Sequence, residues 1–409
     1  MSKNISELSG RKGLSKNLFE ELGLAAAKEG TPSMDDLDRI REEFLVGKST
    51  VYGTVSFYDF LKPENQGKKV YVCNGSACLV AGTQKSVHDK LKSSFDEKEI
   101  GEMCCLGRCH ENSAFHVNGK NYSGNDIDII QDITSKKSLT KEKYHVGSTG
   151  AAVLTTDYGD PAKYYDVFRA FVKRNPSDLI VELKESGLRG RGGAGFPMGF
   201  KLESCKNTPG DTKFIVCNAD EGDPGAFSDR YILENRPHAL LMGMMMAGFI
   251  AGANYGVLYI RGEYPESVDI ISDCVKWLYD QKLIGENILG TGFNFDFKVI
   301  KAQGAYICGE ETALLSSIEG QRPEVRVRPP YPTQQGLFNK PTVVNNVETL
   351  ANLPFIYSHS GKEYAAIGTA KSSGTKLISL DSGFNRPGIY EVDMGTPLSL
   401  VINDLGGGF

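Results

Sequence analysis

The alternation of apolar and polar positions predicts helices in the first part of the chain. Between Leu37 and Leu45 the apolar residues recur every three to four positions, which is the spacing of one face of a helix. Ser33 precedes this stretch and acidic residues fill its first turn, and both features are typical of a helix start. We therefore expect residues 1–62 to form a helical N-terminal segment.

Residues 63–133 show a different pattern, in which short strands alternate with turns. Lys69–Val72 has the pattern of a strand that breaks at Cys73, and the later pair Asn118 and Gly119 is a two-residue turn typical of a β-hairpin. Residues 134–159 are polar, charged and without sustained periodicity, so we expect a linker there.

Apolar runs alternate with helical patterns in residues 160–385, and this predicts an α/β domain. The candidate strands are 213–219, 255–261 and 295–302, and the candidate helices are 237–252 and 265–282. The tail, residues 386–409, has the pattern of a strand, a turn and a helix. Because so few elements cannot bury a core alone, we expect the tail to be part of a further domain.

The composition fits a globular protein of two or three domains, since the chain has 409 residues of which 40% are hydrophobic. The net charge of −5 argues against binding of nucleic acid or of an anionic membrane by the whole surface. Ala239–Ala253 is the longest apolar run, but it is shorter than the roughly 20 residues that span a bilayer, so we expect a buried helix. Residues 1–13 lack the apolar stretch of a signal peptide, so we expect a cytoplasmic protein.

Four of the nine cysteines form two closely spaced pairs. Cys73 and Cys78 have the spacing C-x4-C, Cys105 and Cys109 have the spacing C-x3-C, and 26 residues separate the pairs. Two such pairs suit a 2Fe-2S cluster or a tetrahedral zinc ion, and unligated thiols are the remaining alternative. Cys104 could replace Cys105 as a ligand. The other cysteines and the six histidines show no ligand spacing, so we assign them no role.

The segment Leu188–Lys201, which we call the glycine loop, contains five glycines among basic residues. Glycines reach positive φ angles without steric cost, so consecutive N–H groups can point into one concavity and bind an anion. Arg189, Arg191 and Lys201 add positive charge to this segment. The alternative is a mobile glycine-rich loop.

The glycine loop contains the pattern G-x-G-x-x-G at Gly190, Gly192 and Gly195, but its context contradicts a Rossmann fold. A Rossmann loop comes after a strand and opens a helix, whereas here a helical pattern precedes the loop and Phe196-Pro197 interrupts the segment after it. No Gly-Lys-Ser/Thr closes the loop, so it is not a Walker loop either. We expect an unusual phosphate-binding loop.

Three further polar elements accompany the glycine loop. Acceptors at the end of strand 213–219 suit ribose hydroxyls, carboxylates follow a glycine at an apparent helix start, and an Asn pair that follows an apolar run suits the edge of a polar ring. Taken singly, the same residues fit a solvated acidic turn, a helix cap and an ordinary turn. The residues concerned are Asn218, Asp220, Glu221 and Asp223, then Glu310 and Glu311, and then Asn345 and Asn346.

The order of the motifs GRGGAGFP, CNADEGDPG, GAYICGEETALL and KPTVVNNVETL resembles that of the NADH-oxidising FMN subunit of respiratory complex I. It also resembles that subunit's relatives in soluble NAD-linked hydrogenases and formate dehydrogenases, and the resemblance covers residues 160–409. STVYGTVSFYDF and the two cysteine pairs resemble the small thioredoxin-like 2Fe-2S subunit of the same assemblies over residues 14–130. The resemblance implies an α/β fold in which a thioredoxin-like domain (63–133) is fused to an FMN domain (160–385). Such a fusion favours the hydrogenase and formate dehydrogenase branch.

The resemblance also implies which residues bind each cofactor, because the binding positions of the family can be matched one by one to positions in this sequence. A 2Fe-2S cluster would be bound by Cys73, Cys78, Cys105 and Cys109. FMN would be bound by Gly190, Arg191, Gly192, Lys201, Asn218, Asp220, Glu221, Tyr306, Gly309, Glu310, Asn345 and Asn346. NADH would be bound by Phe196, Asp223, Glu311, Arg328 and Tyr331. Asp223, Arg328 and Tyr331 differ from the residues of many relatives but keep the charge or the ring, whereas Ser204 stands where an aromatic residue is common.

The function implied by the resemblance is that of an NADH:acceptor oxidoreductase, or diaphorase, subunit. Hydride transfer needs stacked rings and no protein acid or base, so we assign no catalytic residue. The expected partners are iron-sulfur and catalytic subunits of a redox complex. The alternatives are a peripheral-arm subunit of a complex I, a flavin-free Rossmann dehydrogenase and a non-catalytic iron-sulfur or zinc scaffold. Carboxylates near the ribose would favour NADH over NADPH.

The resemblance sets one further expectation at the end of the chain. Relatives continue through a ubiquitin-like domain into a helical domain with a 4Fe-4S cluster, and residues 386–409 would be only the start of the first of these. The remainder would be a separate polypeptide or the continuation of a longer chain.

Overall fold

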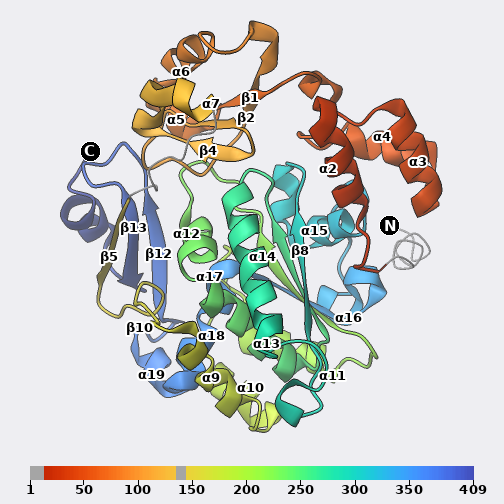
Figure 1. Cartoon of the computed structure of the whole chain (residues 1–409). Coiled ribbons are helices and arrows are strands. Elements are labelled where there is room, and N and C mark those ends of the chain that lie inside the picture. The colour runs from red at the N-terminus through yellow and green to blue at the C-terminus, as the bar shows by residue number, and fades with distance from the viewer. Residues whose placement is uncertain (1–12, 135–143) are drawn as a thin grey trace.

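The computed structural model describes residues 13–134 and 144–409 (Figure 1). Parts of the expected helical segment (1–12) and of the expected linker (135–143) therefore lie outside the described residues. Three helices open the described chain: α2 Leu18–Glu29, α3 Met34–Phe44 and α4 Lys48–Val55. Ser33 is the N-cap of α3 and its side chain accepts a hydrogen bond from the Asp36 amide, as its position in the sequence predicts.

The cysteine-containing region forms a small four-stranded sheet with the order β2-β1-β3-β4. Its strands are β1 Val70–Cys73, β2 Ile100–Met103, β3 Phe115–Val117 and β4 Lys120–Tyr122, and its helices are α5 Ser76–Val80, α6 Gln84–Leu91 and α7 Ile130–Thr134. The predicted hairpin is present, because β3 and β4 are antiparallel and join through Asn118 (φ 52°) and Gly119 (φ 75°). Positive φ at both turn residues matches the twist of the flanking strands. Sequence patterns did not reveal β2, which pairs in parallel with β1.

A parallel four-stranded sheet with the order β8-β7-β6-β9 forms the centre of the molecule. Its strands are β6 Phe214–Ala219, β7 Tyr255–Ile260, β8 Asp296–Lys301 and β9 Thr342–Asn346. The first three occupy the positions that alternation predicts. The fourth, β9, was not predicted as a strand, and it brings Asn345 and Asn346 beside the carboxyl end of β6. Ligands of open α/β sheets bind at this end of the strands.

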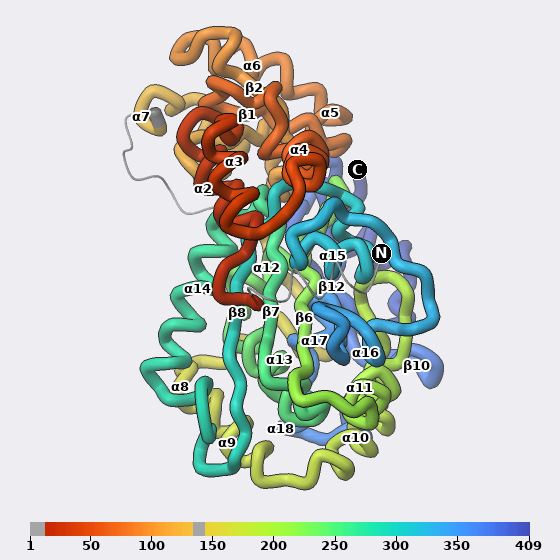
Figure 2. The backbone as a smooth tube through the Cα atoms, turned by 90° about the vertical axis from the view of Figure 1, so that its right-hand side faces the viewer, coloured from red at the N-terminus to blue at the C-terminus, as the bar shows by residue number. Residues whose placement is uncertain are grey.

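Helices cover both faces of the central sheet, as Figures 1 and 2 show. One face packs against α13 Pro237–Ala251 and α14 Pro265–Asp280. On the other face α2 and the end of α4 contribute Leu22 and Val55 to a core that includes Val216 and Val257. The remaining helices are α8 Pro161–Tyr164, α9 Asp166–Phe171, α10 Pro176–Glu185, α11 Met198–Asn207, α12 Ser228–Asn235, α15 Glu311–Ile318, α16 Pro332–Gln335, α17 Val347–Ala351, α18 Leu353–Ser358 and α19 Gly361–Ala366.

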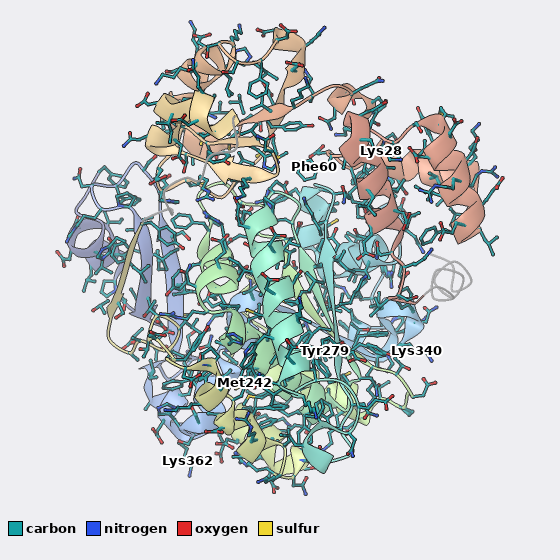
Figure 3. All side chains as sticks on the ribbon, viewed as in Figure 1. Lys28, Phe60, Met242, Tyr279, Lys340 and Lys362 are labelled. Atoms are coloured by element: carbon teal, nitrogen blue, oxygen red, sulfur yellow. The ribbon has the colours of Figure 1, made fainter. Side chains whose placement is uncertain are left out.

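The long apolar run forms the buried helix that we expect. α13 has buried residues on every side, and Figure 3 shows Met242 in the interior of the lower part of the molecule. The helix ends at Gly252 in a left-handed conformation (φ 68°). Within the described part of the chain, no helix has both the length and the apolar character needed to cross a membrane.

A third sheet takes one of its strands from the segment that we expected to be a linker. β5 His145–Thr149 lies inside the segment 134–159 and pairs in parallel with β13 Gly388–Asp393, which pairs with β12 Thr375–Leu380. Figure 1 shows these three strands side by side although they come from distant parts of the chain. The polar sequence of β5 carries no strand signal because its stability comes from the distant partner. The tail thus pairs through β13 with residues 145–149, and the predicted helix after it is a π-helix, Leu400–Leu405.

Candidate functional site

The glycine loop folds back on itself between α10 and α11. The Gly190 amide donates to the Phe196 carbonyl (2.9 Å). At the tip, Gly193 (φ 114°) and Gly195 (φ 62°) adopt angles that L side chains rarely adopt. A helix precedes the loop, so the structure agrees with the exclusion of a Rossmann loop.

Arg191 contributes to this loop differently from the expected phosphate-facing cation. Its guanidinium donates to the Ser373 carbonyl (2.6 Å) and to the Tyr364 hydroxyl (3.2 Å), and its amide donates to Thr349 Oγ1 (2.8 Å). The side chain is buried, because it ties the loop to the segment that leads into β12. Its positive charge is therefore used for anchoring, and at this position of the loop the backbone offers the donors that a ligand could use.

Two adjoining cavities open above the carboxyl ends of the central strands. The first has a volume of about 780 Å³ and the second of about 750 Å³. Both are lined by Gly192, Asn218, Gly309, Glu310 and Asn346. Because these residues are shared, the cavities form one continuous site.

Every residue that the sequence assigns to FMN or NADH lines one of the two cavities. The first cavity adds Gly190, Phe196, Lys201, Glu311, Arg328, Tyr331 and Asn345. The second adds Arg191, Asp220, Glu221, Asp223 and Tyr306. The division does not follow the predicted ligand sets, because Asp223 lies apart from the other residues predicted for NADH. Which residue contacts which cofactor stays a prediction.

Charges in the first cavity are paired. The carboxylate of Glu311 accepts from Lys201 Nζ (2.9 Å) and from Arg328 Nη1 (2.8 Å). Glu310 caps α15 by accepting from the Thr312 and Ala313 amides (both 2.8 Å). The capping interpretation of Glu310 is thus correct. Since Glu311 is neutralised by two cations, its repulsion of a 2′-phosphate is weaker than the sequence implies.

The residues of the first cavity fit a polar ring system. Asn345 is buried, and its Nδ2 has no hydrogen-bond partner among the described residues. A buried amide donor without a partner costs free energy, so a ligand atom that accepts from it would be favoured. Gly192 also fits a close approach, because a Cβ there would lie 3.0 Å from Asn346 Cβ. The donor set and the loop therefore suit a flavin with a phosphate tail.

The second cavity holds half-buried carboxyl groups beside the start of α12. Burial raises the pKa of Asp220 to about 7 and raises that of Glu221 above its ordinary value. Glu221 accepts from the amides of Asp229 (3.0 Å) and Arg230 (3.2 Å). Tyr306 is exposed and donates to Asp223 (2.7 Å). The cavity is thus acidic and rich in hydrogen-bond acceptors.

The four predicted cluster ligands come together in the structure. The Sγ atoms of Cys105 and Cys109 are 3.4 Å apart, and the Cys73 thiol interacts with those of Cys78 and Cys105. All four are buried, whereas Cys104 is exposed. Hydrogen bonds from Cys109 and then Cys73 lower the pKa of Cys105 below that of an ordinary thiol. The arrangement supports Cys105 over Cys104 as the ligand.

Backbone amides point at these sulfurs. Gly107 donates to Cys105 Sγ (3.5 Å), and Gly225 donates to Cys109 Sγ (3.2 Å). Such amides stabilise the negative charge of an iron-sulfur centre. No group of three or more His, Cys, Asp or Glu side chains in residues 13–134 and 144–409 has the arrangement of a single-ion site. The sulfurs lie in two linked pairs, and this donor set fits a two-iron cluster.

The cysteine pairs lie next to the second cavity. Gly225, which donates to Cys109, also lines that cavity. Arg261 donates to the carbonyls of Glu221 and Cys104, and the Ser382 amide donates to the Cys109 carbonyl (2.9 Å). The continuous site formed by the two cavities and the site formed by the four cysteines therefore share a wall.

Sequence reasoning missed several residues of the two cavities. Phe200 and Thr333 line the first, and Lys376 and Ser379 of β12 line the second. Lys376 forms an ion pair with the buried Glu348. Phe200 could have been found from its position one turn before Ser204. Nothing in the local sequence links β12 to the site, because the third sheet places it there.

In comparison with known proteins, both regions match family models. Residues 183–355 match the family model of the Nuo51 FMN-binding domain. Residues 7–138 match that of the thioredoxin-like 2Fe-2S ferredoxin. The chain thus joins an FMN-binding domain to a 2Fe-2S ferredoxin domain, which confirms the expected fold class and the expected cofactors FMN and 2Fe-2S.

Individual relatives agree with this assignment. The F subunit of the NADH-quinone oxidoreductase of Aquifex aeolicus is 46% identical over 244 residues, which are 60% of this chain and 57% of that protein. The alpha subunit of the NAD-reducing hydrogenase HoxS of Cupriavidus necator is 33% identical over 383 residues, which are 86% of this chain and 64% of that one. An air-oxidised NAD⁺-reducing NiFe-hydrogenase structure superposes with a TM-score of 0.79 at 27% identity, covering 95% of this chain and 69% of that chain. The chain spans less than two thirds of either curated relative.

Proposed function

We propose that the chain is a diaphorase-type subunit that oxidises NADH and passes electrons between FMN and iron-sulfur clusters. The observation that carries the proposal is the shared wall: Gly225 lines the second cavity and donates to Cys109. FMN, when bound, supplies two-electron oxidation of NADH and release of electrons one at a time. The close packing suits transfer to the neighbouring cluster. Iron-sulfur and catalytic subunits of a redox complex would be its partners.

The residues of the chain bind and orient rather than transfer protons to a substrate. The glycine loop offers backbone amides to a phosphate, and Asn345 offers an amide to a ring edge. Lys201 and Arg328 would share their charge between Glu311 and the diphosphate of a dinucleotide. Walls from α11 and α16 would exclude water from the stacked rings.

We place this subunit in a soluble NAD-linked hydrogenase or formate dehydrogenase rather than in a complex I. The match to the hydrogenase protein of Cupriavidus necator covers 86% of the chain, whereas the match to the quinone-reductase protein of Aquifex aeolicus covers 60%. A cytoplasmic location belongs to this proposal, since none of the nine cysteines, which all lie in the described residues, forms a disulfide, as a reducing compartment favours.

The test is the cofactor content and reduction of the purified chain. Anaerobic preparation should give FMN, two irons per chain and bleaching of the flavin by NADH. Colourless protein that contains zinc would support the scaffold, and bound NAD without flavin would support the Rossmann dehydrogenase. An equal kcat/KM for NADPH would overturn the preference for NADH.

A further inference from the structure

An exposed aromatic side chain without an assigned role lies in the first cavity. Phe200 is 54% exposed and lines that cavity together with Phe196 and Tyr331. Large exposed aromatic residues that share one concave wall indicate a binding surface. Phe196 and Tyr331 already belong to the predicted NADH set, whereas Phe200 does not.

The ring of Phe200 is held in place from one side. Lys184 Nζ lies 4.7 Å from its centroid and pairs with Glu203 (2.7 Å). The stem of Lys184 runs along Gly199, where a Cβ would lie 2.8 Å from Lys184 Cγ. A cation over one face of a ring orients that ring and polarises it. The Phe200 side chain is therefore held in one orientation although it is exposed.

Phe200 stands one helical turn before Ser204, and residues four apart share one face of a helix. Ser204 also lines the first cavity, but its hydroxyl bonds with Thr333 Oγ1 (2.9 Å), so it presents no ring. Neither residue lines the second cavity, and both therefore lie away from the junction of the two. If the nicotinamide of a dinucleotide lay where the two cavities meet, its purine would extend toward the wall formed by Phe200 and Ser204.

We propose that Phe200, steadied by Lys184, stacks on the adenine of the dinucleotide and supplies the aromatic face that Ser204 lacks. This inference rests on the proposed function. It makes Phe200 a binding and specificity residue for the purine half of the substrate and leaves the nicotinamide half to other residues.

The test separates the two halves of the substrate in the holoprotein. ADP-ribose carries the purine without nicotinamide, and its binding is measured by titration calorimetry. Phe200→Ala should weaken ADP-ribose about tenfold, since stacking on one base is worth roughly this factor or more. The KM for NADH should rise similarly with kcat retained. Flavin content and the kinetics with reduced nicotinamide mononucleotide, which lacks adenine, should be unchanged.

Rescue and control variants keep the result interpretable. Phe200→Tyr should bind ADP-ribose as the wild type does, and Ser204→Phe should restore binding in the Phe200→Ala background. Tyr52→Ala, which removes a ring that is 68% exposed on α4 and lines neither cavity, is the matched control. Equal ADP-ribose affinity in wild type and Phe200→Ala, or no affinity in the wild type, would overturn the inference. Failure of NADH to reduce the flavin while ADP-ribose binding still depends on Phe200 would instead overturn the proposed function.

Discussion

Asp220 shows how burial at the end of β6 changes a single residue. Its pKa is raised to about 7 from 3.8, because the cavity floor disfavours the charged form. Between these values the folded protein holds a proton that the unfolded chain has released. The stability that this proton provides is complete below pH 3.8 and is lost as the pH rises through about 7.

Asp220→Asn should remove this pH dependence. Relative to the wild type, the free energy of unfolding of the variant should rise by about 2 to 3 kcal/mol between pH 5 and pH 8, at about 1.4 kcal/mol per pH unit below the folded pKa. Urea unfolding of the flavin-free protein, followed by the fluorescence of the single tryptophan, measures the difference. A difference that stays constant over this range would show that Asp220 is ionised in the folded protein.

The two adjacent cysteines give a second test at the residue scale. Cys105 is 1% exposed and touches Cys109, whereas Cys104 is exposed. Cys105→Ser should abolish the visible absorption and the reduced-state EPR signal of the cluster, because one thiolate ligand is lost. Cys104→Ser should keep both signals and the iron content. The opposite result would make Cys104 the ligand.

At the scale of elements, a glycine inside a helix has one of two effects. It either allows a neighbouring element to pack closely against the helix, or it only increases the conformational entropy that the chain loses on folding. A Cβ at Gly243 in α13 would lie 2.0 Å from the Leu350 carbonyl oxygen of α17, and a Cβ at Gly53 in α4 would meet nothing within 4 Å. Gly243→Ala should therefore destabilise the protein by about 2 kcal/mol or more through overpacking. Gly53→Ala should stabilise it by roughly 0.5–1 kcal/mol. Denaturant midpoints of the two variants test this; a neutral Gly243→Ala would mean that the helices separate easily.

The buried carboxylate of Glu391 joins elements that are far apart in sequence. It accepts from the amides of Val153, Leu154 and Thr155 (2.8–3.0 Å) and from the Thr375 hydroxyl (2.5 Å). Glu391→Ala leaves these donors unpaired, of which the Leu154 amide and the Thr375 hydroxyl belong to buried residues, and should cost about 3 kcal/mol or more. Glu185→Ala, an exposed acid on α10, should change the thermal midpoint little. Similar midpoints for both variants would contradict the anchoring role.

Some elements could be predicted from the sequence and others could not, for physical reasons. β6, β7 and β8 are apolar runs between helices, and α13 is apolar on all sides, so local patterns reveal them. β5 is polar and forms only because β13 pairs with it, and β9 is too short to stand out from the Asn pair at its end. The site residues were recognisable as motifs, but their division between two cavities depends on where the third sheet places β12.

At the scale of the whole molecule, the cysteine-containing domain is fastened to the central domain by buried polar contacts. Arg230 of α12 is 2% exposed and donates to the Gly107 carbonyl (2.7 Å). Asn121 donates to the Glu263 carbonyl (2.6 Å), and Gly107 packs against Tyr264, where an added Cβ would lie 2.5 Å from the ring. Phe60, labelled in Figure 3, lies in the same region and packs near Cys73. The relative position of cluster and flavin sites depends on these contacts.

Arg230→Met should loosen this attachment without touching either cavity. Removal of one partner of a buried charge cluster costs about 3–5 kcal/mol, and here the neighbouring Glu234 loses its cation. In stopped-flow experiments NADH should still reduce the flavin at the wild-type rate, while reduction of the 2Fe-2S cluster slows at least severalfold. Arg236→Met is the matched control, because Arg236 donates to the Leu154 and Thr155 carbonyls instead of the cysteine domain. If both variants slowed cluster reduction equally, general destabilisation rather than the interface would explain the effect. If neither did, the Arg230 contact would not control the approach of the two centres.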